Sequence, residues 1–231
     1  EMLRSLVGSE MCIRDRRLAE WTGLPLVVAD HLPSAMQSRL PEAAYSGRLR
    51  DLAVELGRMA NDLRLMGSGP TSGIAEIRLP PVQPGSSIMP GKVNPVMCEC
   101  LNMICFRVQG NDLMVSLAAG AGQFELNVMM PIITHGVLES QRLLTNYLPV
   151  FRAKCIEGIE VDEAACRRYA ERTVGLGAAL NPVIGYERAA RVVKYAVEHN
   201  LTIRQAAAAF PDIRPADVEA ALATWMPPAK P

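Results

Sequence analysis

One short segment of this chain combines hydroxyl groups, an ammonium group and an amide just before an expected helix. Residues 85–99 read GSSIMPGKVNPVMCE, so two adjacent serines, Ser86 and Ser87, precede Lys92 and Asn94. The Asn-Pro pair is typical of a helix start, because asparagine caps free backbone N–H groups and proline lacks the N–H that would be unpaired there. These groups and the positive end of a helix together favour an anion. The segment is predicted to bind a carboxylate or a phosphate.

The simplest interpretation of such a segment is a connection, because glycine, serine and proline are common in turns of every kind. A nucleotide-binding P-loop is a more specific alternative, because it has a defined sequence pattern. Its pattern, G-x-x-x-x-G-K-[ST], places a hydroxyl for magnesium directly after the lysine. Here Gly85 and Gly91 enclose one residue too many, and Val93 follows Lys92. The sequence therefore excludes a P-loop and leaves a connection or an anion receptor.

The segment resembles the signature of the fumarase/aspartase superfamily, GSSxMPxKxNPxxxE, and matches it at every fixed position. Shorter matches are NDLRLMGSGP from Asn61, GND from Gly110, GQFELNVMMP from Gly122 and NPVIGY from Asn181. The resemblance covers about residues 17 to 210. It implies a lyase that removes a proton and a leaving group from adjacent carbons of a four-carbon dicarboxylate. The resemblance implies no cofactor and no bound metal, and activation by a divalent ion stays an open alternative. It also implies a homotetramer whose sites are shared between subunits.

The resemblance assigns roles within the loop. Ser86 is the base that removes a proton from the carbon next to a carboxylate, and the substrate is bound by Ser87, Lys92, Val93 and Asn94. A serine hydroxyl is a weak base, so positive potential from Lys92 and from backbone N–H groups must favour its alkoxide. Removal of the proton leaves an aci-carboxylate with two negative charges. Lys92 and Asn94 are expected to stabilise it.

Glu99 lies one turn inside the helix expected from Pro95, and it has two interpretations. The resemblance makes it a catalytic residue in a charge relay with a histidine, whereas an acidic residue in a first turn also complements the helix dipole. That histidine belongs to an upstream Thr-His segment, which this sequence lacks. His135 lies among apolar residues and is expected in the core. We therefore expect this chain to be a C-terminal fragment that is inactive alone.

The choice of substrate depends on weaker matches. Features similar to aspartate ammonia-lyases are NDLRLMGSGP, PVM after KVN, Gly122–Gln123, NVMMP and the LTN at Leu144. Cys98–Glu99 and the FEL at Phe124 are similar to fumarases instead. The expected reaction is the reversible anti-elimination of ammonia from L-aspartate to give fumarate. Hydration of fumarate to L-malate is the first alternative, and an inactive fragment with only a structural role is the second.

Long helices are needed to position these residues. Apolar side chains recur every three or four positions over 48–66, which predicts an amphipathic helix with one buried face. That face comprises Leu52, Leu56, Met59, Leu63 and Met66. Further helices are expected over 95–119 and 124–154, the second kinked by Pro131. Residues 71–91, rich in proline and glycine, are expected to form a long loop.

The expected fold class is all-α, because no run of alternating β-branched residues predicts a sheet. A long-helix bundle is assigned to residues 17–156 and a small helical C-terminal domain to 157–231. Shorter helices in that domain are expected over 162–176, 182–199, 203–209 and 215–225, with Asn181–Pro182 between the first two. Residues 1–16 lack periodicity and resemble a non-native leader.

Composition excludes several classes of protein. The 231 residues include 24 basic and 24 acidic side chains, so no net charge attracts nucleic acid or an anionic membrane. Charged residues interrupt every apolar stretch before it reaches the length of a membrane-spanning helix. The 6 cysteines form no CxxC pair, which indicates reduced thiols, no zinc site and a cytoplasmic location. The expected partner is a small dicarboxylate.

Overall fold

The structure is a computed structural model that describes residues 16–27 and 29–225. The chain divides into two compact units, which comprise Glu1–Asn61 with Val96–Lys154 and Asp62–Pro95 with Cys155–Pro231. Each unit has a core of its own. The expected leader, residues 1–16, lies outside the described residues apart from Arg16, as does Cys12. The expected domain boundary at residue 156 stays a prediction.

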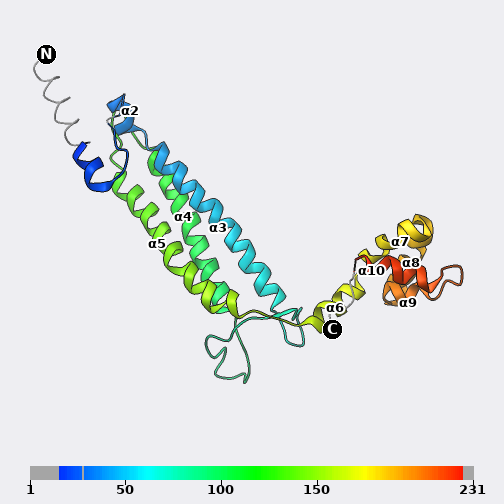
Figure 1. Cartoon of the computed structure of the whole chain (residues 1–231). Coiled ribbons are helices and arrows are strands. Elements are labelled where there is room, and N and C mark those ends of the chain that lie inside the picture. The colour runs from blue at the N-terminus through cyan, green and yellow to red at the C-terminus, as the bar shows by residue number, and fades with distance from the viewer. Residues whose placement is uncertain (1–15, 28, 226–231) are drawn as a thin grey trace, which may run out of the picture. The chain divides into compact units, whose positions relative to one another are not determined.

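Three long helices run through the first unit and lie side by side (Figure 1). They are α3 (Leu40–Met66), α4 (Val96–Ala119) and α5 (Met130–Lys154), and the short α2 (Leu32–Gln37) precedes them. The predicted all-α class and the predicted bundle of long helices are confirmed. The helix α4 begins one residue after the predicted start at Pro95 and ends at the predicted residue.

The helix α3 packs on α4 through small residues. Ala53 is fully buried, and a Cβ at Gly57 would lie 3.7 Å from the Cβ of Cys105. Leu52 and Met59, which were predicted to be buried, are 44% and 36% exposed. For these two residues the prediction was wrong, whereas Leu63 of the same predicted face is buried, at 9% exposure. The buried face also includes the small residues Ala53 and Ala60, each one position after Leu52 or Met59, and a pattern of large apolar residues does not reveal them.

Two helices begin elsewhere than predicted. The helix α3 begins at Leu40 rather than at Arg48, with a proline at its second position. The helix α5 begins at Met130 rather than at Phe124, so Pro131 lies in its first turn and not at a kink. Proline is tolerated in a first turn because the N–H that it lacks has no partner within the helix there.

The turn between α4 and α5 is fixed by Asn127, which is fully buried. Its Nδ2 donates to the carbonyl oxygens of Ala118 and Ala119 at 3.1 and 3.2 Å, and these belong to the last turn of α4, where carbonyls lack helical partners. Its Oδ1 accepts from the N–H of Met129 at 2.8 Å, one residue before α5. One amide therefore ends one helix and begins the next, which explains why the apolar residues 124–129 do not extend α5.

The helix α5 packs closely on α4 at Gly136. A Cβ at this position would lie 2.7 Å from the Cε of Met114 and 3.0 Å from a methyl carbon of Val115. Val115 and Ile133 are buried in this contact. His135, which was predicted to lie in the core, is exposed. Successive helical residues point about 100° apart, so the residue next to Gly136 is directed away from α4.

The second unit joins the long loop after α3 to the chain after α5. Its short elements are β1 (Ile77–Arg78), η1 (Ile156–Gly158), β2 (Glu160–Val161) and α6 (Glu163–Arg172). The two strands pair antiparallel, a contact too short for periodicity to predict. Arg78 forms an ion pair with Asp162 at 3.0 Å. The Asp162 carboxylate also accepts from the N–H of Ala165 at 2.9 Å and so caps α6.

The remaining helices of the second unit form a small core. They are η2 (Val174–Leu176), α7 (Gly177–Ile184), α8 (Tyr186–His199), α9 (Ile203–Ala207) and α10 (Pro215–Ala223). Leu180, Val192 and Ile203 are at most 1% exposed. The predicted break at Asn181–Pro182 was wrong, because Pro182 lies inside α7 and the chain turns at Gly185. Gly185 has a φ of 80°, a conformation that favours glycine.

None of the helices in the described residues is both long enough and apolar enough to cross a lipid bilayer. Within residues 16–27 and 29–225, no group of three or more His, Cys, Asp or Glu side chains is arranged to hold a metal ion. The cysteines that the structure describes are free thiols, and Cys98, Cys105 and Cys155 are buried.

Candidate active-site loop

The loop predicted to bind an anion is closed at its base. The Gly85 N–H donates to the Lys92 carbonyl at 3.0 Å, and the Asn94 side-chain N–H donates to the Gly85 carbonyl at 2.8 Å. A Cβ at Gly85 would overlap the Lys92 carbonyl oxygen and lie 2.7 Å from the carbonyl carbon, so glycine is required here. Gly91 has a φ of 77°, which also favours glycine. The two glycines therefore determine the shape of the loop between them.

The hydroxyl oxygen of Ser86 accepts two backbone hydrogen bonds. The donors are the N–H of Ile88 at 3.1 Å and the N–H of Met89 at 3.2 Å. Hydrogen bonds to an oxygen favour the form in which that oxygen is negatively charged, and converging backbone N–H groups are a common way to bind anions. The arrangement is therefore suited to stabilising an alkoxide on Ser86.

The loop also forms a hollow large enough for a small ligand. Its volume is about 410 Å³, and Ser86, Lys92 and Val93 are among the residues that line it. Ser87 is exposed and Asn94 is half-buried. Three of the five loop residues predicted to act on the substrate, Ser86, Lys92 and Val93, thus border the same hollow, whereas Ser87 and Asn94 are not among the residues that line it. A hydroxyl and an ammonium around such a space form a receptor for a carboxylate.

Glu99 lies in the first turn of α4, in the bundle unit. It is half-buried, and its position agrees both with a supporting catalytic role and with complementing the helix dipole. The same turn is held by Tyr147 of α5, whose hydroxyl donates to the Met97 carbonyl at 2.7 Å. The Tyr147 ring stacks near Phe151, with ring centres 6.3 Å apart. Tyr147 therefore fixes the turn that carries Glu99.

The GND segment supplies two residues that make polar contacts inside the bundle. The Asn111 side chain is buried and donates to Glu139 at 2.8 Å and to the Ser140 hydroxyl at 3.0 Å. Asp112 forms an ion pair with Arg50 of α3 at 3.1 Å. The bond from Asn111 is the main reason that the pKa of Glu139 lies below its usual range. These contacts join α4 to both neighbouring helices.

Three residues that shape these sites were not singled out for those roles from the sequence. Gly85 belongs to the signature, but the need for glycine there arises because a Cβ would overlap the Lys92 carbonyl. That approach depends on the closure of the loop, which residue spacing does not reveal. Tyr147 bonds to a carbonyl 50 residues away, and a contact of that range leaves no local pattern. Asn127 lies within an apolar stretch. Asparagine commonly caps the start of a helix, so its position there could have indicated that α5 begins after it.

Two families of known proteins match parts of this chain. Residues 11–110 match the family described as Lyase, and residues 176–224 match the family described as Fumarase C C-terminus. The two matches together cover more than half of the chain, and the first includes the loop. The chain belongs to the fumarase/aspartase superfamily.

Curated relatives of two activities match at similar identity. A class II fumarate hydratase from Pseudomonas syringae is 48% identical over 84% of this chain and 42% of its own length. An aspartate ammonia-lyase from Bacillus subtilis is 47% identical over 82% of this chain and 40% of its own. One from Pseudomonas fluorescens is 49% identical over 79% and 38%. The chain therefore spans about two fifths of these relatives.

Solved structures show the same fold. A fumarate lyase:delta crystallin from Brucella melitensis has a TM-score of 0.83 at 43% identity, covering 89% of this chain and 44% of that one. A class II fumarase from Schistosoma mansoni has a TM-score of 0.81 at 31% identity, covering 92% and 47%. The fumarase/aspartase fold expected from the resemblance is confirmed.

Proposed function

We propose that this chain supplies the catalytic loop of an aspartate ammonia-lyase. The observation that carries the proposal is the pair of N–H groups, from Ile88 and Met89, that bond to the hydroxyl oxygen of Ser86. They favour the negative charge that a serine base requires. In this proposal Ser86 is the base and Glu99 supports the catalytic machinery. The substrate is held by Ser87, Lys92, Val93 and Asn94.

The proposed reaction balances without an oxidant or a reductant. The Ser86 alkoxide takes a proton from C3 of L-aspartate, and the electron pair left behind moves into the adjacent carboxylate as an aci-carboxylate. That pair then forms the C2–C3 double bond while the C2–N bond breaks, and ammonia leaves with the electrons of that bond. Lys92 and Asn94 stabilise the extra charge of the intermediate, which is larger than that of the substrate.

The choice of aspartate over malate is supported by the flanking segments. NDLRLMGSGP, NVMMP and the other features similar to aspartate ammonia-lyases outnumber those similar to fumarases. Overall identity does not separate the two activities, since fumarate hydratases match at 44% to 48% and aspartate ammonia-lyases at 46% to 49%. Fumarate hydration is therefore kept as the alternative activity, and an inactive structural chain is the second alternative.

Ultraviolet absorbance of fumarate distinguishes these functions. The test uses a polypeptide of the relatives' full length that carries this sequence, because the chain covers about two fifths of them. L-Aspartate should yield fumarate and L-malate should not. Formation of fumarate from malate alone would assign the hydratase, and no fumarate from either would favour the structural role. We also propose that the reaction needs no cofactor, so L-aspartate in buffer alone should yield fumarate. An activating divalent ion is left open, and the rate before and after dialysis against a chelator measures its effect.

We propose further that the protein is a homotetramer. The bundle unit supports this assembly, because α4 and α5 carry large apolar side chains that are exposed in the single chain. Burial of such side chains is the main favourable term in association. Sedimentation of the full-length polypeptide should give the mass of four chains, and a monomer at micromolar concentration would contradict the assembly.

A further inference from the structure

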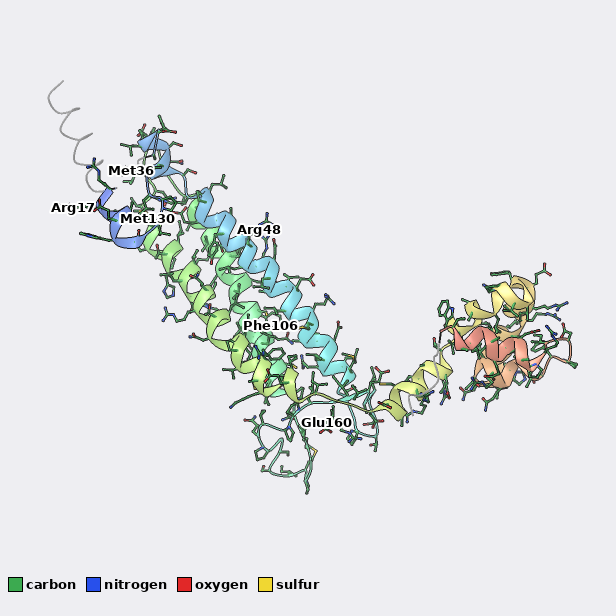
Figure 2. The ribbon with its side chains drawn as sticks, viewed as in Figure 1. Arg17, Met36, Arg48, Phe106, Met130 and Glu160 are labelled. Atoms are coloured by element: carbon green, nitrogen blue, oxygen red, sulfur yellow. The ribbon has the colours of Figure 1, made fainter. Side chains whose placement is uncertain are left out.

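The catalytic loop follows a short stretch of chain that is held by residues much later in the sequence. We call residues 76–80 the stem of the loop and residues 156–166 the anchor. The strands β1 and β2 pair here, with Arg78 of the stem opposite Glu160 of the anchor, which Figure 2 labels. Stem and anchor belong to the same compact unit, so this pairing fixes where the stem begins.

The carbonyl of Glu76, at the start of the stem, accepts two hydrogen bonds from the anchor. The donors are the N–H of Asp162 at 2.9 Å and the thiol of Cys166 at 3.6 Å. The side chain of Arg78 also forms an ion pair with Asp162 at 3.0 Å. The anchor therefore holds both the backbone and a side chain of the stem, which gives the loop a defined starting point.

Gly158 of the anchor lies directly against Pro80, the last residue of the stem. A Cβ at Gly158 would lie 2.6 Å from the Cγ of Pro80. Unbonded carbon atoms prefer separations of about 3.5 to 4.0 Å, and a proline ring is bonded to its own backbone and cannot turn away. The φ of Gly158 is not positive, so its backbone conformation gives no reason for glycine. The close approach of Pro80 supplies that reason.

The segment between the stem and the closure of the loop is stiff. Residues 79–85 read LPPVQPG, so prolines make up much of the path from β1 to Gly85. Proline fixes φ near about −65° and also restricts the residue before it. Proline-rich segments therefore act as semi-rigid spacers rather than as flexible links. A shift of Pro80 is consequently passed on to Gly85, whose N–H closes the loop on the Lys92 carbonyl.

The residues after the stem form one wall of the hollow that Ser86 borders. Pro81 and Pro84 both line it, whereas Gly158 does not. The wall therefore starts directly after the residue that Gly158 contacts. A displacement of Pro80 moves this wall, and with it changes the distance between the Ser86 oxygen and a bound substrate.

We propose that Gly158 is a positioning residue for the catalytic loop, because it leaves room for Pro80 and so sets where the stiff segment carries Ser86. The inference rests on the lyase function proposed above, and it adds a residue that lies outside the signature and does not touch the substrate. Misplacing a reacting group by about 1 Å can lower the rate by about 10²-fold. The missing methyl group at Gly158 therefore matters for catalysis and not only for packing.

Gly158→Ala in the full-length polypeptide tests this role. It should lower kcat for fumarate formation from L-aspartate by about 10- to 100-fold and change KM by less than about threefold, because alignment of the base matters most in the transition state. Gly175→Ala is the matched control, since the same change in η2 of the same unit meets an ordinary contact, 3.4 Å from the Thr173 hydroxyl oxygen. It should keep the parent kcat. A parental kcat for Gly158→Ala would overturn the proposal.

Removal of the ring that the new methyl group meets should rescue the variant. Pro80→Ala removes the Cγ and leaves a Cβ that would lie 3.4 Å from the methyl group. Added to Gly158→Ala, it should raise kcat to within a few fold of Pro80→Ala alone. A general loss of structure would not be relieved at this one neighbour, so a double variant no faster than Gly158→Ala would also reject the positioning role.

Hydrogen exchange of the Gly85 amide is a readout that does not require activity. This N–H closes the loop on the Lys92 carbonyl, so Gly158→Ala should accelerate its exchange and the double variant should restore it. Unchanged exchange in Gly158→Ala would contradict the positioning role even in an active enzyme. Absence of fumarate from the parent would reject the lyase function alone, so the two failures are distinguishable.

Discussion

At the scale of single residues, the proposed chemistry depends on where the N–H groups of the loop point. Those of Ile88 and Met89 converge on the Ser86 oxygen, and the bond from Gly85 to Lys92 closes the loop that orients them. Donors that are already in place need no rearrangement when negative charge forms. The backbone of the loop therefore contributes as much to the proposed site as its side chains.

Gly85→Ala should inactivate the enzyme although it removes no functional group. The new methyl group would overlap the Lys92 carbonyl oxygen, so the closing hydrogen bond would be lost and the donors to Ser86 displaced. Losing aligned donors to a reacting oxygen lowers kcat by about 10²- to 10³-fold. Fumarate formation measures the effect. Ser72→Ala, an exposed change in the same long loop that does not line the hollow, is the control and should keep the parent rate. Near-normal turnover of Gly85→Ala would show that the closure is dispensable.

The residues of the loop were predictable from the sequence, but their hydrogen bonds were not. Signature residues such as Ser86 and Lys92 follow each other within a few positions, so a linear pattern identifies them. The closure between Gly85 and Lys92 depends on backbone angles, including the positive φ of Gly91. Such angles are set by the whole loop and leave no spacing pattern.

At the scale of the helices, Asn111 is the buried polar contact between α4 and α5. Asn111→Ala should lower the free energy of unfolding by about 1 to 3 kcal/mol, because it leaves Ser140 and Glu139 without their buried donor. Urea unfolding followed by circular dichroism measures this change. Gln109→Ala on the same helix is the control, since the Gln109 side chain bonds only within α4, to the Cys105 carbonyl. Equal stability losses in the two variants would contradict the role of Asn111.

The cap of α6 should weaken in acid. The pKa of Asp162 lies below its usual range, chiefly because the Ala165 N–H bonds to its carboxylate and also because Arg78 does. A lowered pKa in the folded state means that the stabilisation is complete above about pH 4 and is lost as the pH falls through the folded pKa. Hydrogen exchange of the Ala165 amide, corrected for its intrinsic pH dependence, should accelerate over that range.

Asp162→Asn is the matched control for this effect. Asparagine caps a helix about as well as aspartate but does not titrate. Its Ala165 amide should keep the same protection across the acid range. An acid-induced loss of protection of equal size in both proteins would assign the effect to another group.

The sequence predicted which segments form helices better than it predicted where each helix ends and which side of it is buried. Apolar periodicity that repeats over several turns predicted α3, and the Asn94–Pro95 pair predicted the start of α4 to within one residue. The start of α5 was missed because one side chain, Asn127, bonds both to the end of α4 and to the backbone just before α5. The buried face of α3 was predicted in part: Leu63 is buried, but Leu52 and Met59 are exposed, because the small residues Ala53 and Ala60 beside them are buried instead. Both features depend on contacts with α4, which a single helix does not encode.

At the scale of the whole molecule, the two compact units carry different parts of the proposed function. The second unit holds the loop with Ser86 and Lys92, and the first holds Glu99 and the exposed apolar side chains of α4. Self-association through those side chains would bring further chains to the assembly, as shared sites require. The proposed lyase activity therefore requires both the loop of one chain and an assembly of several chains.

The most direct test of the central claim is the rate of fumarate formation from L-aspartate by Ser86→Ala in the full-length polypeptide. Removal of the proposed base should lower kcat by about 10³-fold or more, while the mutant still binds dicarboxylate in a competition assay. Ser86→Ala should keep the helix content of the parent, so that lost activity reports on chemistry. Turnover within a few fold of the parent would show that the Ser86 oxygen is not the base, and the proposed mechanism would be rejected.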